Sequence, residues 1–353
     1  MSNYNFRIKN ISNRLNPDNL ELATNLSDEE YPSIFYTDVT RYVKLAMKGV
    51  DPLYTRKSKE AGEKVKSHLL NELDNVEYEY QGSVMTDTHI KGNSDIDLLV
   101  ISTKFYTFDR EGITKLINDP VEIRNLNQLQ INSLKKELSG TGYHGALEDL
   151  RHNRIQSEST LKGIYDICDC THPKAIKIKN KTLNRDVDIV IANWYDNSSS
   201  VLNDKKKQYR GIQVYDKDNN SKCSPDYPFL SIYRINEKNS NTNGRLKKMI
   251  RFLKNIKIDS ELDIQLSSFD INAICYQIDK SLYISKNKYE LIEVIFNQLN
   301  SLAHNINYLE NLKSVDEREY IFRGKESKIN SLILLLLKEV YSILEDLKKE
   351  DIL

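Results

Sequence analysis

The chain has 353 residues, with 51 Lys and Arg balanced by 51 Asp and Glu, so its formal net charge is zero. A chain of this length can bury a core without disulfide staples, and a neutral balance excludes strong long-range attraction to polyanions. The four cysteines predict reduced thiols, and no stretch reaches the roughly eighteen apolar residues of a membrane span. These features predict a cytoplasmic protein without a membrane anchor.

The first part of the chain mixes helical and strand patterns. A Ser-x-x-Glu capping box at 27–30 opens a helical pattern that Asp51-Pro52 interrupts, and a second helix is expected over 56–73. These two pieces predict a kinked N-terminal spine helix. Further along we expect strands over 76–80, 96–101, 174–179 and 186–192, the last two forming a hairpin, and helix over 111–139. The pattern predicts an α+β core over 1–225.

The second part of the chain is mostly helical. Residues 196–226 are polar and rich in turn residues, with one short strand candidate at 211–215, and are interpreted as the join between lobes. The apolar run LILLLL at 332–337 favours a buried helix. Helices are expected near 242–257, 268–279, 287–303 and 327–349. These patterns predict a helical C-terminal lobe over 226–353.

Two acids stand one residue apart in an apolar strand, at Asp95 and Asp97. Successive side chains of a strand point to opposite faces, so these carboxylates project together while Ile96 and Leu98 take the other face. Paired carboxylates repel unless a cation lies between them, and such oxygen ligands suit Mg²⁺, which completes its shell with water and substrate phosphate. Alone, the pair supports only a candidate cation site, because Asp-x-Asp at a strand end is common.

A Gly-Ser pair and a third acid extend the pattern. Eleven residues separate Ser83 from Asp95, and Gly82 would let the backbone approach phosphate oxygens while the Ser83 hydroxyl donates to them. Asp188, in the apolar strand DVDIVIA, supplies the third carboxylate needed to hold two metal ions. Together the three elements favour a metal-dependent phosphate site.

This combination resembles the signature of the DNA polymerase β-like nucleotidyltransferase superfamily, which implies a mixed sheet. The spine helix, the gap of about ninety residues between Asp97 and Asp188, and the helical lobe resemble its cGAS/DncV-like branch, the CD-NTases. Arg245 to Lys254 resembles the basic helix with which that family holds the triphosphate through Lys247 and Arg251, with Lys254 on the same face; a solvated basic face is the alternative.

Residues Ser268 and Phe269 resemble the helix start at which the family places a Ser on the phosphates and an aromatic ring on a nucleobase. The alternative is that Ser268 caps the helix and Phe269 packs in the core. By resemblance, Gly82, Ser83, Lys247, Arg251, Ser268 and Phe269 bind nucleotide.

The resemblance also implies the reaction and its partners. Asp95, Asp97 and Asp188 would hold two Mg²⁺ ions, for which Mn²⁺ can substitute, while NTPs are joined into a cyclic di- or oligonucleotide with release of pyrophosphate. The product would act on a separate effector protein in bacterial anti-phage (CBASS-type) signalling, and a protein regulator is compatible with the family. The neutral charge argues against an obligatory long DNA activator.

Other readings of the sequence stay open. The same site could add a single NMP to RNA, a protein or a small molecule, or the chain could sense NTPs without turnover. Cys168, Cys170 and His172 form a C-x-C-x-H pattern, which is not a recurrent zinc spacing and favours ordinary thiols. The sequence does not determine the bases, the linkage or the ring size.

Overall fold

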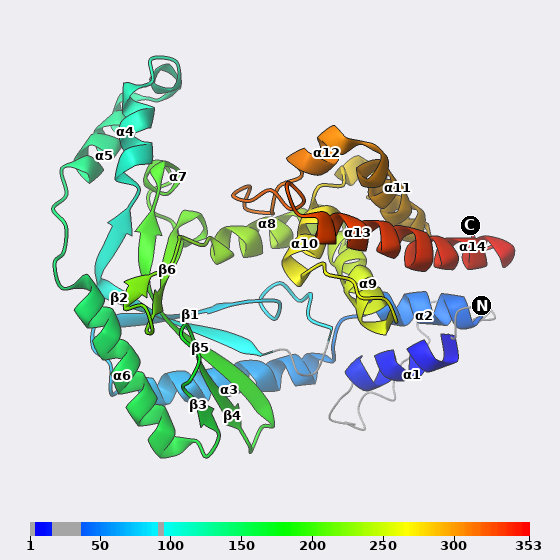
Figure 1. Cartoon of the computed structure of the whole chain (residues 1–353), viewed down its shortest axis with the longest axis horizontal. Helices are drawn as coiled ribbons and strands as arrows, with labels where there is room; N and C mark the ends of the chain where they lie inside the picture. The colour runs from blue at the N-terminus through cyan, green and yellow to red at the C-terminus, as the bar shows by residue number, and fades with distance from the viewer. Residues whose placement is uncertain (1–3, 16–36, 91–94) are drawn as a thin grey trace. The chain divides into compact units, whose positions relative to one another are not determined.

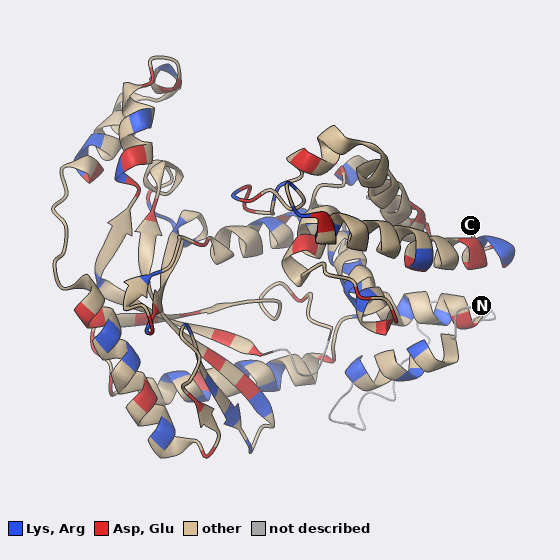
Figure 2. Ribbon diagram, viewed as in Figure 1, with Lys and Arg blue, Asp and Glu red and all other residues tan. Residues whose placement is uncertain are grey.

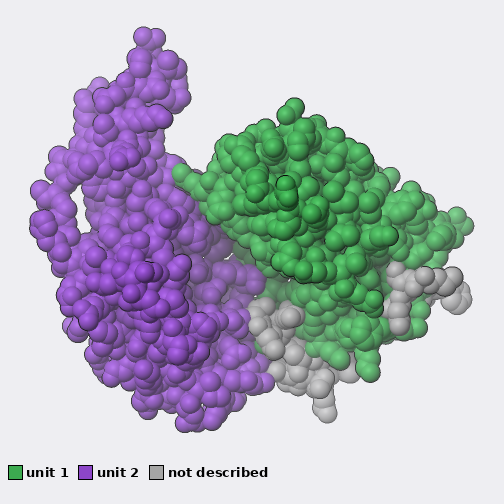
Figure 3. All heavy atoms as spheres, viewed as in Figure 1, with its two compact units in different colours: residues 1–55, 86–94, 234–353 green, residues 56–85, 95–233 purple. Residues whose placement is uncertain are grey.

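The computed structural model describes residues 4–15, 37–90 and 95–353, and the chain divides into two compact units (Figure 3). Unit 1 contains residues 1–55, 86–94 and 234–353, and unit 2 contains residues 56–85 and 95–233. The chain passes from one unit to the other inside helices α3 (Pro52–Leu69) and α8 (Pro228–Ser240), and also at 85/86 and 94/95.

Unit 2 contains a mixed sheet (Figure 1). Its strands follow the order β1-β2-β5-β4-β3, and β6 pairs with both β5 and β7. β2 and β5 are parallel, whereas the other pairs are antiparallel. The strands are β1 (Val76–Gln81), β2 (Ile96–Phe108), β3 (Cys168–Asp169), β4 (Ile176–Asn180), β5 (Arg185–Asp196), β6 (Gly211–Asp216) and β7 (Ser221–Lys222).

The two central strands are buried on both faces because helices and side chains cover each side. Leu98 and Val100 of β2 pack in one cluster with apolar residues of α3 and of α6 (Ala146–Ile164), while Leu99 and Ile101 pack on the opposite face with Trp194. This alternation assigns every second residue of β2 and β5 to the same face. It confirms the predicted strands and the hairpin of β4 and β5.

Three further elements of unit 2 differ from or refine the sequence prediction. The expected helix over 111–139 is α4 (Arg110–Asn118), a short 3-10 turn (Glu122–Asn125) and α5 (Gln128–Leu138). The buried face of helix α6 includes the polar residues Asn153, Arg154 and Ser157, which interrupt the apolar spacing of its sequence. Residues 196–226 are not a join between lobes, since β6 pairs with β5 and buries Ile212 in the sheet.

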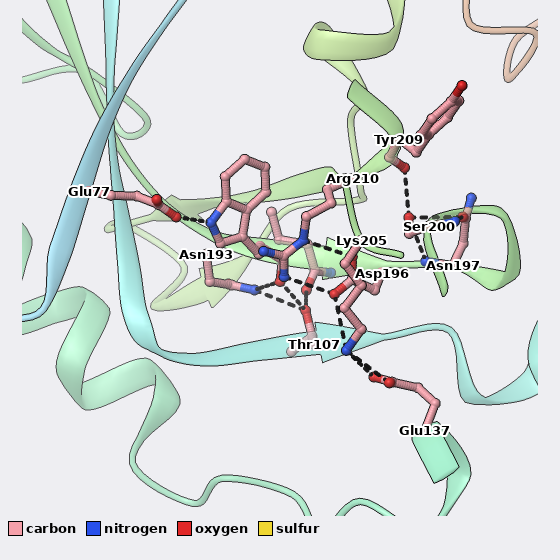
Figure 4. A network of polar contacts seen from close by, with 12 residues as sticks. Glu77, Thr107, Glu137, Asn193, Asp196, Asn197, Ser200, Lys205, Tyr209 and Arg210 are labelled. Atoms are coloured by element: carbon pink, nitrogen blue, oxygen red, sulfur yellow. Dashed lines mark hydrogen bonds and ion pairs between the residues drawn. The ribbon is translucent and has the colours of Figure 1, made fainter. Parts of the chain in front are cut away.

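A buried polar network stabilises the end of β5 (Figure 4). The Asp196 carboxylate accepts two hydrogen bonds from the Arg210 guanidinium, at 2.9 and 2.8 Å, and lies 3.8 Å from the Lys205 ammonium. Because Asp196 is fully buried, its charge needs such partners. The network ties β5 to the segment that precedes β6.

Unit 1 is helical. Its helices include α1 (Tyr4–Leu15), α2 (Asp38–Met47), α9 (Arg245–Asp259), α10 (Ser268–Tyr276), α11 (Glu290–His304), α12 (Ile306–Asn311), α13 (Glu326–Leu334) and α14 (Tyr341–Lys349), and a π-helical segment (Leu335–Val340) joins the last two. The LILLLL run crosses α13 into that segment; Leu332, Leu335 and Leu336 are buried, whereas Leu337 is 55% exposed. None of the described helices has the length and apolar character needed to cross a bilayer.

The predicted boundary at 225/226 differs from this division. Val39, Tyr42 and Val43 of α2 share one hydrophobic core with the C-terminal helices, so the N-terminal helices belong with them. The expected spine helix is two helices, since α2 ends at Met47 and α3 begins at Pro52, a residue suited to the first helical position. The predicted capping box at 27–30 lies outside the described residues.

Candidate functional site

The acids of unit 2 meet at one end of the parallel strand pair. Asp97 on β2 lies directly opposite Asp188 on β5, and Asp95 stands immediately before β2. Both strand positions share the face that carries Leu99 and Val190 farther along. The structure therefore brings the predicted pair and the distant third acid to the same edge of the sheet.

Burial and, after it, crowded negative charge perturb these carboxyls. Burial, followed by the charges of Asp188 and Asp95, raises the pKa of Asp97 to about 6. Burial and the charge of Asp188 likewise raise the pKa of Asp95. Each shift means that the ionised carboxylates lack sufficient counter-charge, which is the condition under which a divalent cation binds well.

A lysine missed by the sequence prediction lies among the acids. Lys177 on β4 faces Asp188, and its ammonium is 3.0 Å from Asp188 Oδ2 and 4.0 Å from Asp95 Oδ2. The hydrogen bond to Asp188 raises the pKa of Lys177. In the sequence, Lys177 is only one of the lysines of the expected strand KAIKIK. The register of β4 and β5 is needed to show that it faces Asp188.

The predicted Gly-Ser turn follows β1 next to Asp97. Gly82 has φ +87°, and a Cβ at this position would come within 2.5 Å of Asp97 Oδ2. The turn closes with the Met85 amide donating to the Gly82 carbonyl at 3.2 Å, and Ser83 is half-buried inside it. Both the backbone conformation and the close approach to the carboxylate require glycine.

The donor chemistry of this edge fits a magnesium site, because it offers hard carboxylate oxygens and a backbone turn suited to phosphate. Among the residues that the structure describes, no three His, Cys, Asp or Glu side chains already converge closely enough to enclose a metal ion. The Lys177 ammonium supplies positive charge between two of the acids instead.

The predicted basic helix is α9 in unit 1, along which Lys and Arg recur (Figure 2). Arg251 is buried, and its guanidinium donates to the carbonyls of Met47 at 2.9 Å and Asp87 at 2.8 Å. Lys254 is also buried and donates to Thr88, and burial lowers its pKa to about 8. These two cations hold the chain around residues 86–90, so the predicted row of three phosphate-facing cations is wrong for Lys254.

Lys247, one turn before Arg251, is half-buried, and burial lowers its pKa. Its backbone amide donates to the Asn239 side chain at 3.0 Å. Among the described residues no carboxylate lies within ion-pair distance of the Lys247 ammonium. A phosphate contact for Lys247 or Arg251 remains a prediction.

The two serines at the start of α10, Ser267 and Ser268, have different roles. Ser267 caps the helix: its hydroxyl accepts from the Asp270 amide at 3.1 Å, and Asp270 accepts from the Ser267 amide at 2.7 Å. The alternative in which Ser268 is the cap is therefore wrong. Ser268 is exposed and Phe269 is 37% exposed, so neither serves the core, and their roles toward phosphate and base remain predictions.

Near β3, the sulfur atoms of Cys168 and Cys170 lie 3.7 Å apart, and the His172 ring lies 3.3 Å from an Asp169 oxygen. The imidazole thus has a carboxylate partner close by. The three residues considered for zinc sit at the edge of the sheet formed by β3 and β4.

The mixed sheet has one acid on a strand, a second immediately before that strand and a third on the parallel neighbour, with an adjoining Gly-Ser turn. Together with a separate helical unit, this arrangement is that of a nucleotidyltransferase. Residues 233–344 match the family model described as the cGAS/DncV-like nucleotidyltransferase C-terminal helical domain. The chain belongs to the cGAS/DncV-like nucleotidyltransferases, as its relatives also show.

Among these relatives, a c-di-GMP synthase from Capnocytophaga granulosa is 54% identical over 97% of this chain and 98% of its own length. A c-di-GMP synthase from a Lachnospiraceae bacterium is 46% identical over 98% of each chain. The structure of a STING-associated CdnE c-di-GMP synthase from Flavobacteriaceae sp. aligns with a TM-score of 0.89 at 38% identity, covering 99% of both chains. The α+β fold and the family predicted from the sequence are therefore confirmed.

Proposed function

We propose that this enzyme makes c-di-GMP from two molecules of GTP. The observation that carries the chemistry is the register of β2 and β5, in which Asp97 lies opposite Asp188 and beside Asp95. The choice of guanine rests on the relatives, three of which are c-di-GMP synthases. In the first transfer a ribose hydroxyl oxygen of one GTP bonds to the α-phosphorus of the other, its proton leaves to solvent, and the bond to pyrophosphate breaks. In the second transfer the free ribose hydroxyl of the resulting linear dinucleotide bonds to that dinucleotide's own 5′ α-phosphorus, again with loss of a proton to solvent and release of pyrophosphate.

The three acids would hold two Mg²⁺ ions, or Mn²⁺ in their place. Such ions neutralise charge on the phosphates and favour deprotonation of the attacking hydroxyl. Gly82 leaves room for the Asp97 carboxylate and for a phosphate close to the backbone. Lys177 holds Asp188 in position through its 3.0 Å contact and reduces repulsion among the acids.

The remaining predicted residues would bind the nucleotides. Ser83, Lys247, Arg251 and Ser268 would contact the phosphates, with Lys247 and Ser268 the better placed because their side chains are not enclosed in the core. Phe269 would stack on a base, since its ring is partly exposed at the start of α10. The protein contributes mainly positioning and charge neutralisation.

The product would act on a separate effector protein. Because the Flavobacteriaceae relative is STING-associated, we propose an effector of that kind, and a role in cytoplasmic defence against phage. The zero net charge is consistent with a small-molecule or protein trigger in place of a long DNA activator.

The test is incubation of the full chain with each labelled NTP, singly and together, with Mg²⁺ or Mn²⁺, followed by phosphatase. We expect a phosphatase-resistant product from GTP alone that co-migrates with c-di-GMP, and no product from the Asp97→Asn variant. Label that stays linear or becomes attached to RNA, protein or a small molecule would instead support transfer of a single NMP. GTP binding without any consumption would support a silent sensing module.

A further inference from the structure

A cavity of about 560 Å³ lies in unit 2 at the end of β2 remote from the acids. Its wall includes Thr103 to Phe108, six or more residues beyond Asp97, so at the usual rise of a strand it is on the order of 20 Å away. Its volume falls in the range of small-molecule sites. None of the residues proposed for the nucleotidyltransferase reaction lines this cavity.

The cavity wall is an irregularity in the central strand. Ser102 pairs with Asn193 and Tyr106 pairs with the next residue, Trp194, so Thr103, Lys104 and Phe105 have no partner on β5. Such bulges redirect side chains and recur beside functional sites. Here the bulge places Lys104 and Phe105 in the cavity wall, opposite the loop that contains Gly142 and Tyr143.

The wall is held in place by specific bonds. The Asp149 carboxylate of α6 accepts from the Lys104 ammonium at 2.8 Å and from the Tyr143 hydroxyl at 2.7 Å, which joins the bulge to the loop. On the neighbouring side, the Lys205 ammonium lies 3.9 Å from the centre of the Tyr106 ring and belongs to the network around Asp196 (Figure 4). The cavity is therefore preorganised.

An aromatic platform lines the cavity. The rings of Phe105 and Tyr143 stack with centroids 5.4 Å apart and planes 14° from parallel. Phe105 is buried whereas Tyr143 is 49% exposed, so about half of the Tyr143 surface is accessible for contact with another flat ring. The adjacent Gly142 leaves space, since a Cβ there would meet nothing within 4 Å.

Two cations of the wall lack an acidic partner. Within the described chain, no carboxylate lies within ion-pair distance of Lys222 or Arg110. Lys222 is half-buried at 6.0 Å from the centre of the Phe105 ring, and burial lowers its pKa. Arg110 donates to the carbonyls of Leu138 and Gly140, which positions the loop. An incoming anion would give Lys222 the counter-charge that the protein does not provide.

We propose that this cavity is a second nucleotide-binding site, in which a base stacks on Tyr143 and a phosphate pairs with Lys222. The stacked rings of Phe105 and Tyr143 would bind the base, and the Lys222 ammonium would bind the phosphate. The ligand would be a purine nucleotide, either a mononucleotide that resembles the substrate or the cyclic dinucleotide. Because β2 carries both the cavity wall and Asp97, occupancy of the cavity can report nucleotide levels to the catalytic edge.

The test is hydrogen exchange of the full chain in EDTA, read by mass spectrometry on peptides that cover residues 103–108 and 139–146. GMP, c-di-GMP, guanosine and inorganic phosphate are added separately, each up to millimolar concentration. We expect protection of both peptides by GMP or by c-di-GMP, and the stronger of the two identifies the source. These peptides contain none of the three acids, and the readout does not depend on the product that the enzyme makes.

Matched variants separate binding from folding. Lys222→Ala and Tyr143→Ala should each raise about tenfold the ligand concentration that gives half-maximal protection. Lys222→Arg and Tyr143→Phe should leave this concentration unchanged, because they keep the charge and the ring. Lys222→Ala should keep GTP consumption within about twofold of the wild type in the absence of added product. Absence of protection by both nucleotides, protection by guanosine alone or by phosphate alone, or protection unchanged in Lys222→Ala would overturn the proposal.

Discussion

Asp97→Asn should stabilise the metal-free protein at pH 8, although it should abolish synthesis. In the folded protein, burial and the charges of Asp188 and Asp95 raise the pKa of Asp97 from 3.8 to about 6. One pKa unit corresponds to about 1.4 kcal/mol, so ionised Asp97 lowers the free energy of unfolding by at most about 3 kcal/mol. Asn has nearly the same shape and no charge, and it removes that penalty.

The sign of the pH dependence follows from the direction of the shift. Well below pH 3.8 the carboxyl is protonated in both the folded and the unfolded state, so it carries no penalty. The penalty grows as the pH rises from the ordinary pKa of 3.8 to the folded pKa of about 6, and is complete at pH 8. The stabilisation by Asp97→Asn should therefore be greatest at pH 8 and roughly half as large at pH 5.

Urea unfolding of the full chain in EDTA at both pH values measures this difference. Asp186→Asn is the matched control. Asp186 lies on the same face of β5 as Asp188, but it is paired with Lys179 and does not belong to the pair of Asp97 and Asp188. Mg²⁺ should stabilise the wild type more than Asp97→Asn, since on the proposed function it would bind the folded acids. A variant less stable than the wild type at pH 8, or equally stabilised at both pH values, would refute the reasoning.

Three further predictions test the turn and unit 1. Gly82→Ala should lower stability by about 1–2 kcal/mol and activity more than tenfold, because its Cβ would lie 2.5 Å from an Asp97 oxygen at φ +87°; melting and turnover assays check this. Ser267→Ala should cost about 1 kcal/mol of stability as a lost cap, whereas Ser268→Ala should raise the KM for GTP and leave the urea midpoint unchanged. Arg251→Lys should destabilise by about 1–3 kcal/mol in urea unfolding, because an ammonium does not span two backbone carbonyls as the guanidinium does.

The acids could be predicted because their pattern is local. Alternation along a strand puts Asp95 and Asp97 on one face whatever surrounds them, and an apolar run marks the strand of Asp188. The Gly82-Ser83 turn follows from residue type in the same way. The helices of unit 1 were predictable in type because apolar residues recur at helical spacing over long stretches.

What the sequence by itself determined is therefore the type of each element, the acids and the turn, since these depend on neighbours along the chain. Only the tertiary structure decided that Lys177 faces Asp188, that Arg251 and Lys254 are buried, and that α1 and α2 pack with the C-terminal helices. It also decided the bulge that opens the cavity beside Phe105. The physical reason is that register and burial depend on partners far away in the chain, and residue type and spacing alone do not specify those partners.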